Sequence, residues 1–447
     1  MFHIYGRCLR KLYVTIASRI NKGGTVLNTF LIFILFIYLF KEVVEYVVEY
    51  LNLRHMKKAG LSIPPEFQGK MDEALMKKIR EYESEKTRFS FISSVFGNIV
   101  TILFIFGGLL DIYNSWIASL GFPFMVSGWV FFILLSYAND FLSVPFSLYH
   151  TFHIENRYGF NTMTFRLWIS DFIKSLVLST VVASLVLFAG LWLMQWSPHF
   201  WWFWVWVFLL LFSIFMMYLS PYVIEPLFNK FTPIEDGSLK ERILAITEKA
   251  GIHVSRILRI DASKRSRHTN AYFTGIGKTK RIVFYDTLLE GMAHNEILTV
   301  LAHEIGHWKR HHLLKTMVIL EATSLAALSL CSTLIQGDLL TTLFHISEET
   351  VFAKLVLLGF LGGIIAFALK PLMNSLMRRH EREADYASYE LTKDAESMVS
   401  AFVKLSKENL SNLHPHPLYV ALHYSHPPIL ERIRSIRNMG NKENQPR

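Results

Sequence analysis

The stretch Ala302-His303-Glu304-Ile305-Gly306-His307-Trp308 lies inside an apolar segment with helical periodicity that runs from about residue 295 to 314. His303 and His307 are four residues apart, so on a helix their rings leave the same face, one above the other. Two imidazoles placed in this way can share one tetrahedral cation, and Glu304 can reach a water on that cation. The pattern predicts a zinc site, the alternative being a helix with two histidines satisfied by hydrogen bonds.

The composition is that of a membrane protein. Of 447 residues, 52% are hydrophobic, 14% aromatic and 18% charged, and the apolar residues come in long blocks. A water-soluble domain carries roughly 25% charged residues. The formal net charge is +10, but the basic residues stand between apolar blocks, which favours loops beside anionic lipid headgroups over nucleic-acid binding. The two cysteines, Cys8 and Cys331, are too few for a cysteine zinc site or a disulfide framework.

Seven apolar stretches are long enough to cross a bilayer: residues 26–46, 91–112, 125–144, 172–194, 201–218, 316–334 and 351–372, each with approximate ends. We therefore expect an all-α polytopic membrane protein that also carries a small α+β zinc-protease domain. The expected divisions are an N-terminal extension of unassigned role (1–24), spans one to five with their loops (25–221), the zinc-protease domain (222–315), spans six and seven (316–372) and C-terminal helices that complete the zinc site (373–447).

The segment from residue 222 to 296 is the only long water-compatible stretch before the motif. Residues 236–251 read as an amphipathic helix that ends at a glycine. Short strands are predicted at 256–260, 270–273 and 281–285, with the Gly275-Ile276-Gly277-Lys278 turn before the last of them. A small sheet therefore precedes the zinc helix.

A third ligand is expected from Arg378-Arg379-His380-Glu381-Arg382-Glu383-Ala384-Asp385. Glu381 and Asp385 are four residues apart and share one helix face. This suits a carboxylate that binds the cation and a second one that accepts the free N–H of a ligand histidine. Glu383 points to another face of the helix and is not the expected ligand. A charged helix surface is the alternative interpretation of this stretch.

The predicted chemistry is hydrolysis of a peptide bond. Zinc held by His303, His307 and Glu381 leaves one position for water, and Glu304 is the expected general base. The developing oxyanion needs a further donor. We assign that part to His426, with Arg432 close behind it on the next helix; the alternative for His426 is a loop or helix-capping residue.

The distribution of charge predicts the orientation in the membrane. The loops around residues 52–86, 150–168 and 222–315, together with the C-terminal region, fall on one face and hold most of the Lys and Arg. The positive-inside rule then places the motif in the cytosol. The basic residues within 1–24 fall on the opposite face and conflict with this assignment.

Three motifs in this order, with about seven spans, resemble the type I CAAX prenyl proteases: His303-Glu304-Ile305-Gly306-His307-Trp308, Glu381-Arg382-Glu383-Ala384-Asp385, and His423 through Arg432. These are membrane zinc metalloproteases of the gluzincin clan that process farnesylated proteins such as yeast a-factor and prelamin A. Other matching segments are Ile63-Pro64-Pro65-Glu66, Gly159-Phe160-Asn161, Phe231-Thr232-Pro233, Ser263-Lys264-Arg265-Ser266 and Asn270-Ala271-Tyr272-Phe273.

The resemblance implies a ring of seven helices that enclose a water-filled chamber, capped by the zinc domain. By motif, the ligands of a single Zn²⁺ are His303, His307 and Glu381, the base is Glu304, and Asp385 lies behind the ligands. Asn270 and Ala271 match the edge strand that pairs with the substrate backbone. His426 and Arg432 match the pair that faces the tetrahedral intermediate. The implied activity is removal of the last three residues of a prenylated protein.

Two other functions stay open on the sequence. One is a broad-specificity membrane quality-control metalloprotease with the same site, and the other is a non-enzymatic transporter or scaffold in which the motif is incidental. The expected partners are a farnesylated protein or peptide and the lipid bilayer, with no nucleic acid. The expected location is the endoplasmic reticulum membrane in a eukaryote or the plasma membrane in a bacterium.

Overall fold

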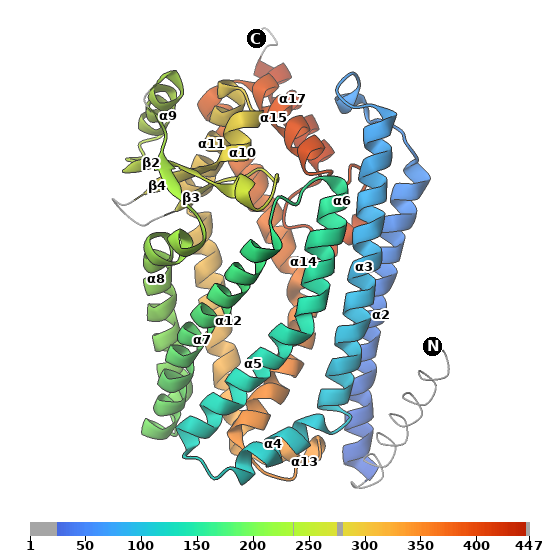
Figure 1. The fold of residues 1–447 in the computed structure, drawn as a ribbon, viewed down its shortest axis with the longest axis vertical. Coiled ribbons are helices and arrows are strands. Elements are labelled where there is room, and N and C mark those ends of the chain that lie inside the picture. The colour runs from blue at the N-terminus through green and yellow to red at the C-terminus, as the bar shows by residue number, and fades with distance from the viewer. Residues whose placement is uncertain (1–24, 236, 275–279, 444–447) are drawn as a thin grey trace.

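The computed structural model describes residues 25–235, 237–274 and 280–443. The N-terminal extension and the predicted glycine turn before the last strand lie outside these ranges. Long helices run side by side through most of the molecule, and a smaller unit that contains the sheet sits at one end of them (Figure 1). The structure thus separates an apolar helical body from a domain compatible with water.

Six helical segments of the described residues are long and apolar enough to cross a membrane. They are α3 (Glu73–Ile105), α5 extended through α6 (Phe124–Tyr158), α7 (Phe165–Trp196), α8 (Trp201–Phe228), α12 (His312–Gln336) and α14 (Val351–Thr392). Helix α2 (Thr25–Ala59) runs alongside α3 and exposes an apolar face that includes Phe30, Phe33 and Phe36 (Figure 1). The all-α polytopic class is confirmed; the chamber stays a prediction.

Two membrane segments differ in detail from the sequence analysis. The polar stretch before span two is the first part of α3, which begins after Asp72; the Asp72 carboxylate accepts the backbone N–H of Leu75 at 2.8 Å. The same helix ends at Ile105 because Gly108 adopts a left-handed φ of 91° before α4 (Leu109–Ser119). The expected loop after span three is helical: α5 (Phe124–Tyr149) continues through a π turn (His150–Glu155) into α6 (Asn156–Tyr158).

The sheet of the described residues has four strands in the order β1-β2-β4-β3. They are β1 (Phe231–Pro233), β2 (Arg256–Ile260), β3 (Ala271–Thr274) and β4 (Arg281–Tyr285). β2 and β4 are parallel, while β1 and β3 pair antiparallel to β2 and β4. β1 is not among the strands expected from the sequence; it is three residues long and ends in proline. β3 lies at the edge of the sheet, with one side paired to β4.

Helices α9 (Ser238–Lys249), α10 (Asp286–Gly291) and α11 (His294–Lys309) complete the core around this sheet. Ile243, Ile282, Phe284 and Ile297 are fully buried between them. Burying such a side chain contributes about 1.5–3 kcal/mol, so the core fixes α11 against the sheet. Helix α11 ends at Lys309 and α12 begins at His312, because His311 between them has a left-handed φ of 55°.

Helix α14 is continuous over 42 residues, so span seven and Glu381 belong to one rigid element despite Pro371. Helices α15 (Ala395–Glu408), α16 (Pro417–His423) and α17 (Ile429–Glu443) follow it. The remaining short elements are α13 (Leu339–Leu343) and 3-10 turns at Pro65–Phe67 and Ala262–Lys264.

Helices α11 and α14 meet at Gly306. A Cβ built on this glycine would lie 2.9 Å from the backbone carbonyl oxygen and the Cα of Ala384. Real Cβ atoms do not approach backbone this closely, so only glycine allows this helix separation. The contact falls between the two motif histidines of α11 and the carboxylates of α14, and it therefore sets the spacing of the site.

We expect Gly306→Ala to force α11 away from α14, because the added methyl group has no space beside Ala384. Overpacking of this kind costs about 1–3 kcal/mol. The melting temperature of the purified protein should fall, and its bound metal should decrease. Gly363→Ala on α14 is the control, because a Cβ there meets nothing within 4 Å. Equal behaviour of the two variants would contradict this account.

Candidate metal centre and catalytic site

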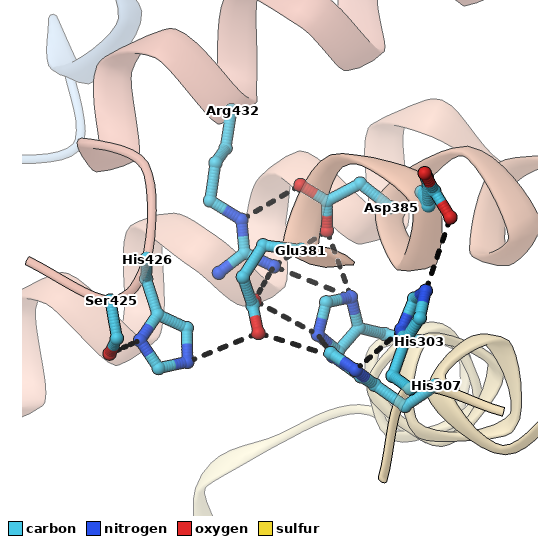
Figure 2. A network of polar contacts seen from close by, with 9 residues as sticks. His303, His307, Glu381, Asp385, Ser425, His426 and Arg432 are labelled. Atoms are coloured by element: carbon cyan, nitrogen blue, oxygen red, sulfur yellow. Dashed lines mark hydrogen bonds and ion pairs between the residues drawn. The ribbon is translucent and has the colours of Figure 1, made fainter. Parts of the chain in front are cut away.

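Three ligand atoms converge where α11 crosses α14. His303 and His307 come from α11 and Glu381 from α14 (Figure 2). The two histidine Nε2 atoms are 3.2 Å apart. His303 Nε2 lies 3.4 Å from Glu381 Oε2, and His307 Nε2 lies 3.2 Å from Glu381 Oε1. Within the described residues, these three side chains form the one group that could hold a metal ion.

This geometry fits a tetrahedral metal. Metal–ligand bonds of about 2.0 Å put neighbouring ligand atoms about 3.3 Å apart, close to the three separations observed. Glu381 Oε2 is buried and has no hydrogen-bond partner, which is costly unless another group satisfies it. Two imidazoles and one carboxylate are also a typical ligand set for catalytic zinc. The residues present therefore fit the predicted ion.

His303 is held from behind by a buried ion pair. Its Nδ1 lies 2.9 Å from Asp385 Oδ1, so Nε2 is the nitrogen that faces the site. Arg432 donates to both Asp385 oxygens, from Nε at 2.8 Å and from Nη2 at 2.6 Å. Asp385 is only 2% exposed, so the fork-like contact with Arg432 offsets the cost of burying its charge. The structure thus brings Asp385 behind the ligands, where its sequence position suggested.

His307 has its own support, which the sequence analysis missed. His312 Nδ1 lies 3.0 Å from His307 Nδ1, and His312 Nε2 lies 3.2 Å from Glu383 Oε2. The His312 ring also stacks on His380, with centroids 4.1 Å apart. Glu383 is not one of the three candidate ligands, but it contacts His312, which lies behind His307. Helical spacing could not predict this contact, because Glu383 lies in α14 and His307 in α11. His312, which joins them, lies in α12 beyond the break between α11 and α12.

Glu304 lines a cavity of about 450 Å³ together with His303, Glu381 and Arg432. Burial raises the pKa of Glu304, and the charges of the nearby histidines oppose this shift. A carboxylate with a raised pKa can both accept and release a proton. The cavity thus holds a group suited to proton transfer beside the three candidate ligands.

His426 lies at the other side of this cavity, in the turn between α16 and α17. Its Nε2 is 3.4 Å from Glu381 Oε1, and its Nδ1 is 2.9 Å from Ser425 Oγ (Figure 2). The preceding segment is tied to α14: Arg378 donates to the carbonyls of Val420 and Tyr424 at 3.0 and 2.7 Å. Asn374 donates to the Leu422 carbonyl at 2.7 Å.

One face of α14 therefore carries residues of the metal centre and residues that hold the segment before His426. Asn374, Arg378, Glu381 and Asp385 follow one another at steps of four, three and four residues, which keeps them on one helical face. The first two hold the segment that leads to His426, and the other two face α11. The positions of Asn374 and Arg378 follow the same periodicity as the motif, but their backbone partners are visible only in the tertiary structure.

The edge strand opens toward the same cavity. Asn270 and Ala271 line it next to His303 and Glu304. The side-chain Oδ1 of Asn270 accepts the backbone N–H of Ala271 at 2.8 Å. The backbone carbonyl of Asn270 accepts the N–H of Tyr285 at 3.1 Å. The structure thus brings together all nine residues that the sequence analysis selected. They are His303, Glu304, His307, Glu381, Asp385, His426, Arg432, Asn270 and Ala271.

Comparisons with known proteins identify a family. Residues 52–230 match the family described as the CAAX prenyl protease N-terminal domain with five membrane helices, and residues 233–440 match peptidase family M48. CAAX prenyl protease 1 of Saccharomyces cerevisiae is 32% identical, over 88% of this chain and 93% of the yeast protein. The Homo sapiens homologue is 30% identical, over 86% and 91% of the two chains. The crystal structure of S. mikatae Ste24p has a TM-score of 0.82 at 31% identity and covers 90% of this chain and 98% of that one.

The chain belongs to the CAAX prenyl protease 1 family. It is a multi-pass membrane metalloprotease, and the resemblance stated from its motifs is confirmed. The alternative of a transporter or scaffold with an incidental motif is set aside on the same findings.

We expect Asp385→Asn to lower the affinity for Zn²⁺ by about 10- to 100-fold, because the ligand His303 loses its charged hydrogen-bond partner. Glu383→Gln should weaken binding in the same direction through His312. Competition with a chromophoric chelator measures both effects. Glu390→Gln, farther along the same helix in an exposed pair with Lys393, is the control and should leave the affinity unchanged. Unaltered Zn²⁺ affinity in Asp385→Asn would contradict this role.

Proposed function

We propose that this protein is a zinc-dependent membrane endopeptidase that removes the last three residues from prenylated CaaX proteins or peptides. The observation that carries the proposal is one cavity lined by His303, Glu381, the half-buried Glu304 and the edge-strand residue Ala271, with His307 in contact with Glu381. In Figure 1 this cavity's elements lie at the end of the membrane helices, within reach of a substrate held by a lipid anchor. Relatives named as CAAX prenyl proteases support the choice of substrate.

His303, His307 and Glu381 would hold the zinc ion. When bound, zinc supplies Lewis-acid polarisation of the scissile carbonyl and lowers the pKa of water in the site. Glu304 accepts the proton from the attacking water on its carboxylate and then delivers it to the departing amine. The raised pKa that burial gives Glu304 suits both transfers.

His426 and Arg432 face the position where charge develops on the carbonyl oxygen. In its neutral form the exposed His426 ring carries one N–H. If Ser425 Oγ donates to Nδ1, that N–H lies on Nε2, on the side of Glu381. Arg432 is fixed by Asp385 through two of its nitrogens, and its remaining terminal nitrogen points to the His426 side (Figure 2). Two such donors would stabilise the oxyanion.

The substrate backbone would add to the free side of β3. Strand addition uses main-chain hydrogen bonds, so it accepts many sequences. This mode fixes the scissile bond beside Glu304 without selecting particular side chains. We place the site on the cytosolic side, since most Lys and Arg of the loops share its face, and the protein in the endoplasmic reticulum membrane, since the relatives named above are eukaryotic.

The test compares a farnesylated and an unprenylated CaaX peptide with wild-type protein and with Glu304→Gln. Wild type should release the C-terminal tripeptide from the farnesylated peptide, and chelation should abolish this activity. Glu304→Gln should keep its zinc and lose activity by at least about 100-fold, because no group remains to move the proton. Mass spectrometry of the products and metal analysis give both results.

Each other outcome has a definite meaning. Equal cleavage of both peptides would overturn the substrate assignment and indicate the quality-control alternative. Full activity of Glu304→Gln would contradict the assignment of the base, and loss of zinc in this variant would show a structural effect instead.

Arg378 should act on turnover through His426, because it holds the backbone of the segment that precedes this histidine. We expect Arg378→Gln to lower kcat by roughly tenfold while zinc content stays unchanged. In a double-mutant cycle, Arg378→Gln should cost little in a His426→Phe background, since residues that act as a unit are not additive. Additive losses in kcat would show that Arg378 stabilises something other than the position of His426.

A further inference from the structure

A second large cavity, of about 900 Å³, lies where α7, the end of α8 and the sheet meet. It shares no lining residue with the cavity of the metal centre. β1, β2 and the first residue of β4 form its wall on the side of the sheet, and Figure 1 shows the sheet directly beyond the end of α8. The cavity thus lies at the boundary between the apolar helices and the water-compatible domain.

The cavity is strongly basic. Its lining contains six basic side chains and one acidic one, Asp261; the basic residues are Lys174, Lys230, Lys240, Arg256, Lys264 and Arg281. Asp261 Oδ1 already accepts the backbone N–H of Lys230 at 2.6 Å. Among the described residues, no carboxylate forms an ion pair with Lys230, Arg256 or Lys264. The excess positive charge therefore faces an open space of molecular size.

Arg281 adds a buried charge to this cavity. The residue is only 5% exposed, and its Nε and Nη2 are buried without a hydrogen-bond partner in the described part of the chain. Its guanidinium carbon lies 4.3 Å from the centroid of the Tyr222 ring, a contact that offsets part of the cost of burial. A buried charge without a counterion is expensive, so an anion in the cavity would stabilise this arrangement.

The surface beside the cavity is apolar. Ile173 of α7 is 53% exposed, and Val223 and Leu227 of α8 are each 48% exposed. Lys174 donates to the Leu227 carbonyl at 2.9 Å and so links the two helices at this level. Basic side chains directly above exposed apolar ones match a molecule with an anionic head and a hydrocarbon tail. Free phosphate would make no use of the apolar part.

We propose that this cavity binds the phosphate of an anionic phospholipid headgroup, with the acyl chains along the exposed faces of α7 and α8. The phosphate would offset the excess positive charge of the lining, to which Lys230, Arg256 and Arg281 contribute. Basic residues at a membrane boundary attract anionic lipid in this way. The site is separate from the catalytic cavity, because the two share no lining residue.

The test uses full-length protein in mixed micelles that contain dioleoylphosphatidylglycerol or dioleoylphosphatidylcholine. Lipid retained after detergent washing is counted by native mass spectrometry for wild type and for Lys230→Gln/Arg256→Gln. The matched control is Lys78→Gln/Arg88→Gln, which removes the same charge from another basic cavity. Wild type should retain phosphatidylglycerol over phosphatidylcholine. The first double variant should lose affinity for phosphatidylglycerol by about 30-fold, the attraction expected from two basic residues at a headgroup, and the control should lose less than about twofold.

Equal losses in both double variants would overturn the proposal, because they would show only a general attraction to positive charge. Absence of a preference for phosphatidylglycerol in wild type would also overturn it. A separate arm adds inorganic phosphate: displacement of the lipid at millimolar concentration would show that free phosphate is the true ligand.

Discussion

The close crossing of α11 and α14 at Gly306 is the constraint on which the site depends. A catalytic metal needs ligands placed to within a fraction of an ångström, and here His307 and Glu381 lie 74 residues apart in the chain. Backbone contact between Gly306 and Ala384 sets the helix separation without an intervening side chain. The core around the sheet fixes the position of α11. The membrane-spanning part of α14 fixes the position of Glu381, because both belong to one continuous helix.

Charge pairing around this crossing explains why so many ionisable groups can be buried together. Asp385 and Arg432 satisfy each other and orient His303, while His312 and Glu383 orient His307. In each case the contact is made by Nδ1 of the histidine, which leaves Nε2 directed at the candidate metal position. Glu381 Oε2 is the buried oxygen at this point without a hydrogen bond, as expected where a cation belongs.

The membrane contributes more than an anchor. Because α14 passes without a break from its apolar span to Glu381, the position of the site relative to the bilayer is fixed by one helix. The same helix holds the segment that leads to His426. The basic cavity at the end of α8 lies at the same boundary, so a lipid headgroup there would help to seat the sheet, including the edge strand β3, on the membrane helices.

The sequence by itself predicted the apolar spans, the helix that carries His303 and His307, and Glu381 as the third candidate ligand. Apolar length identifies a membrane helix, and spacings of four residues place His303 with His307 and Glu381 with Asp385 on shared faces. Only the tertiary structure decided the partners that no periodicity relates: His312 with Glu383, Arg378 with the carbonyls of α16 and the following turn, and Arg281 with its basic cavity. Local spacing encodes which side chains share a face, whereas these contacts depend on how separate helices and strands pack against one another.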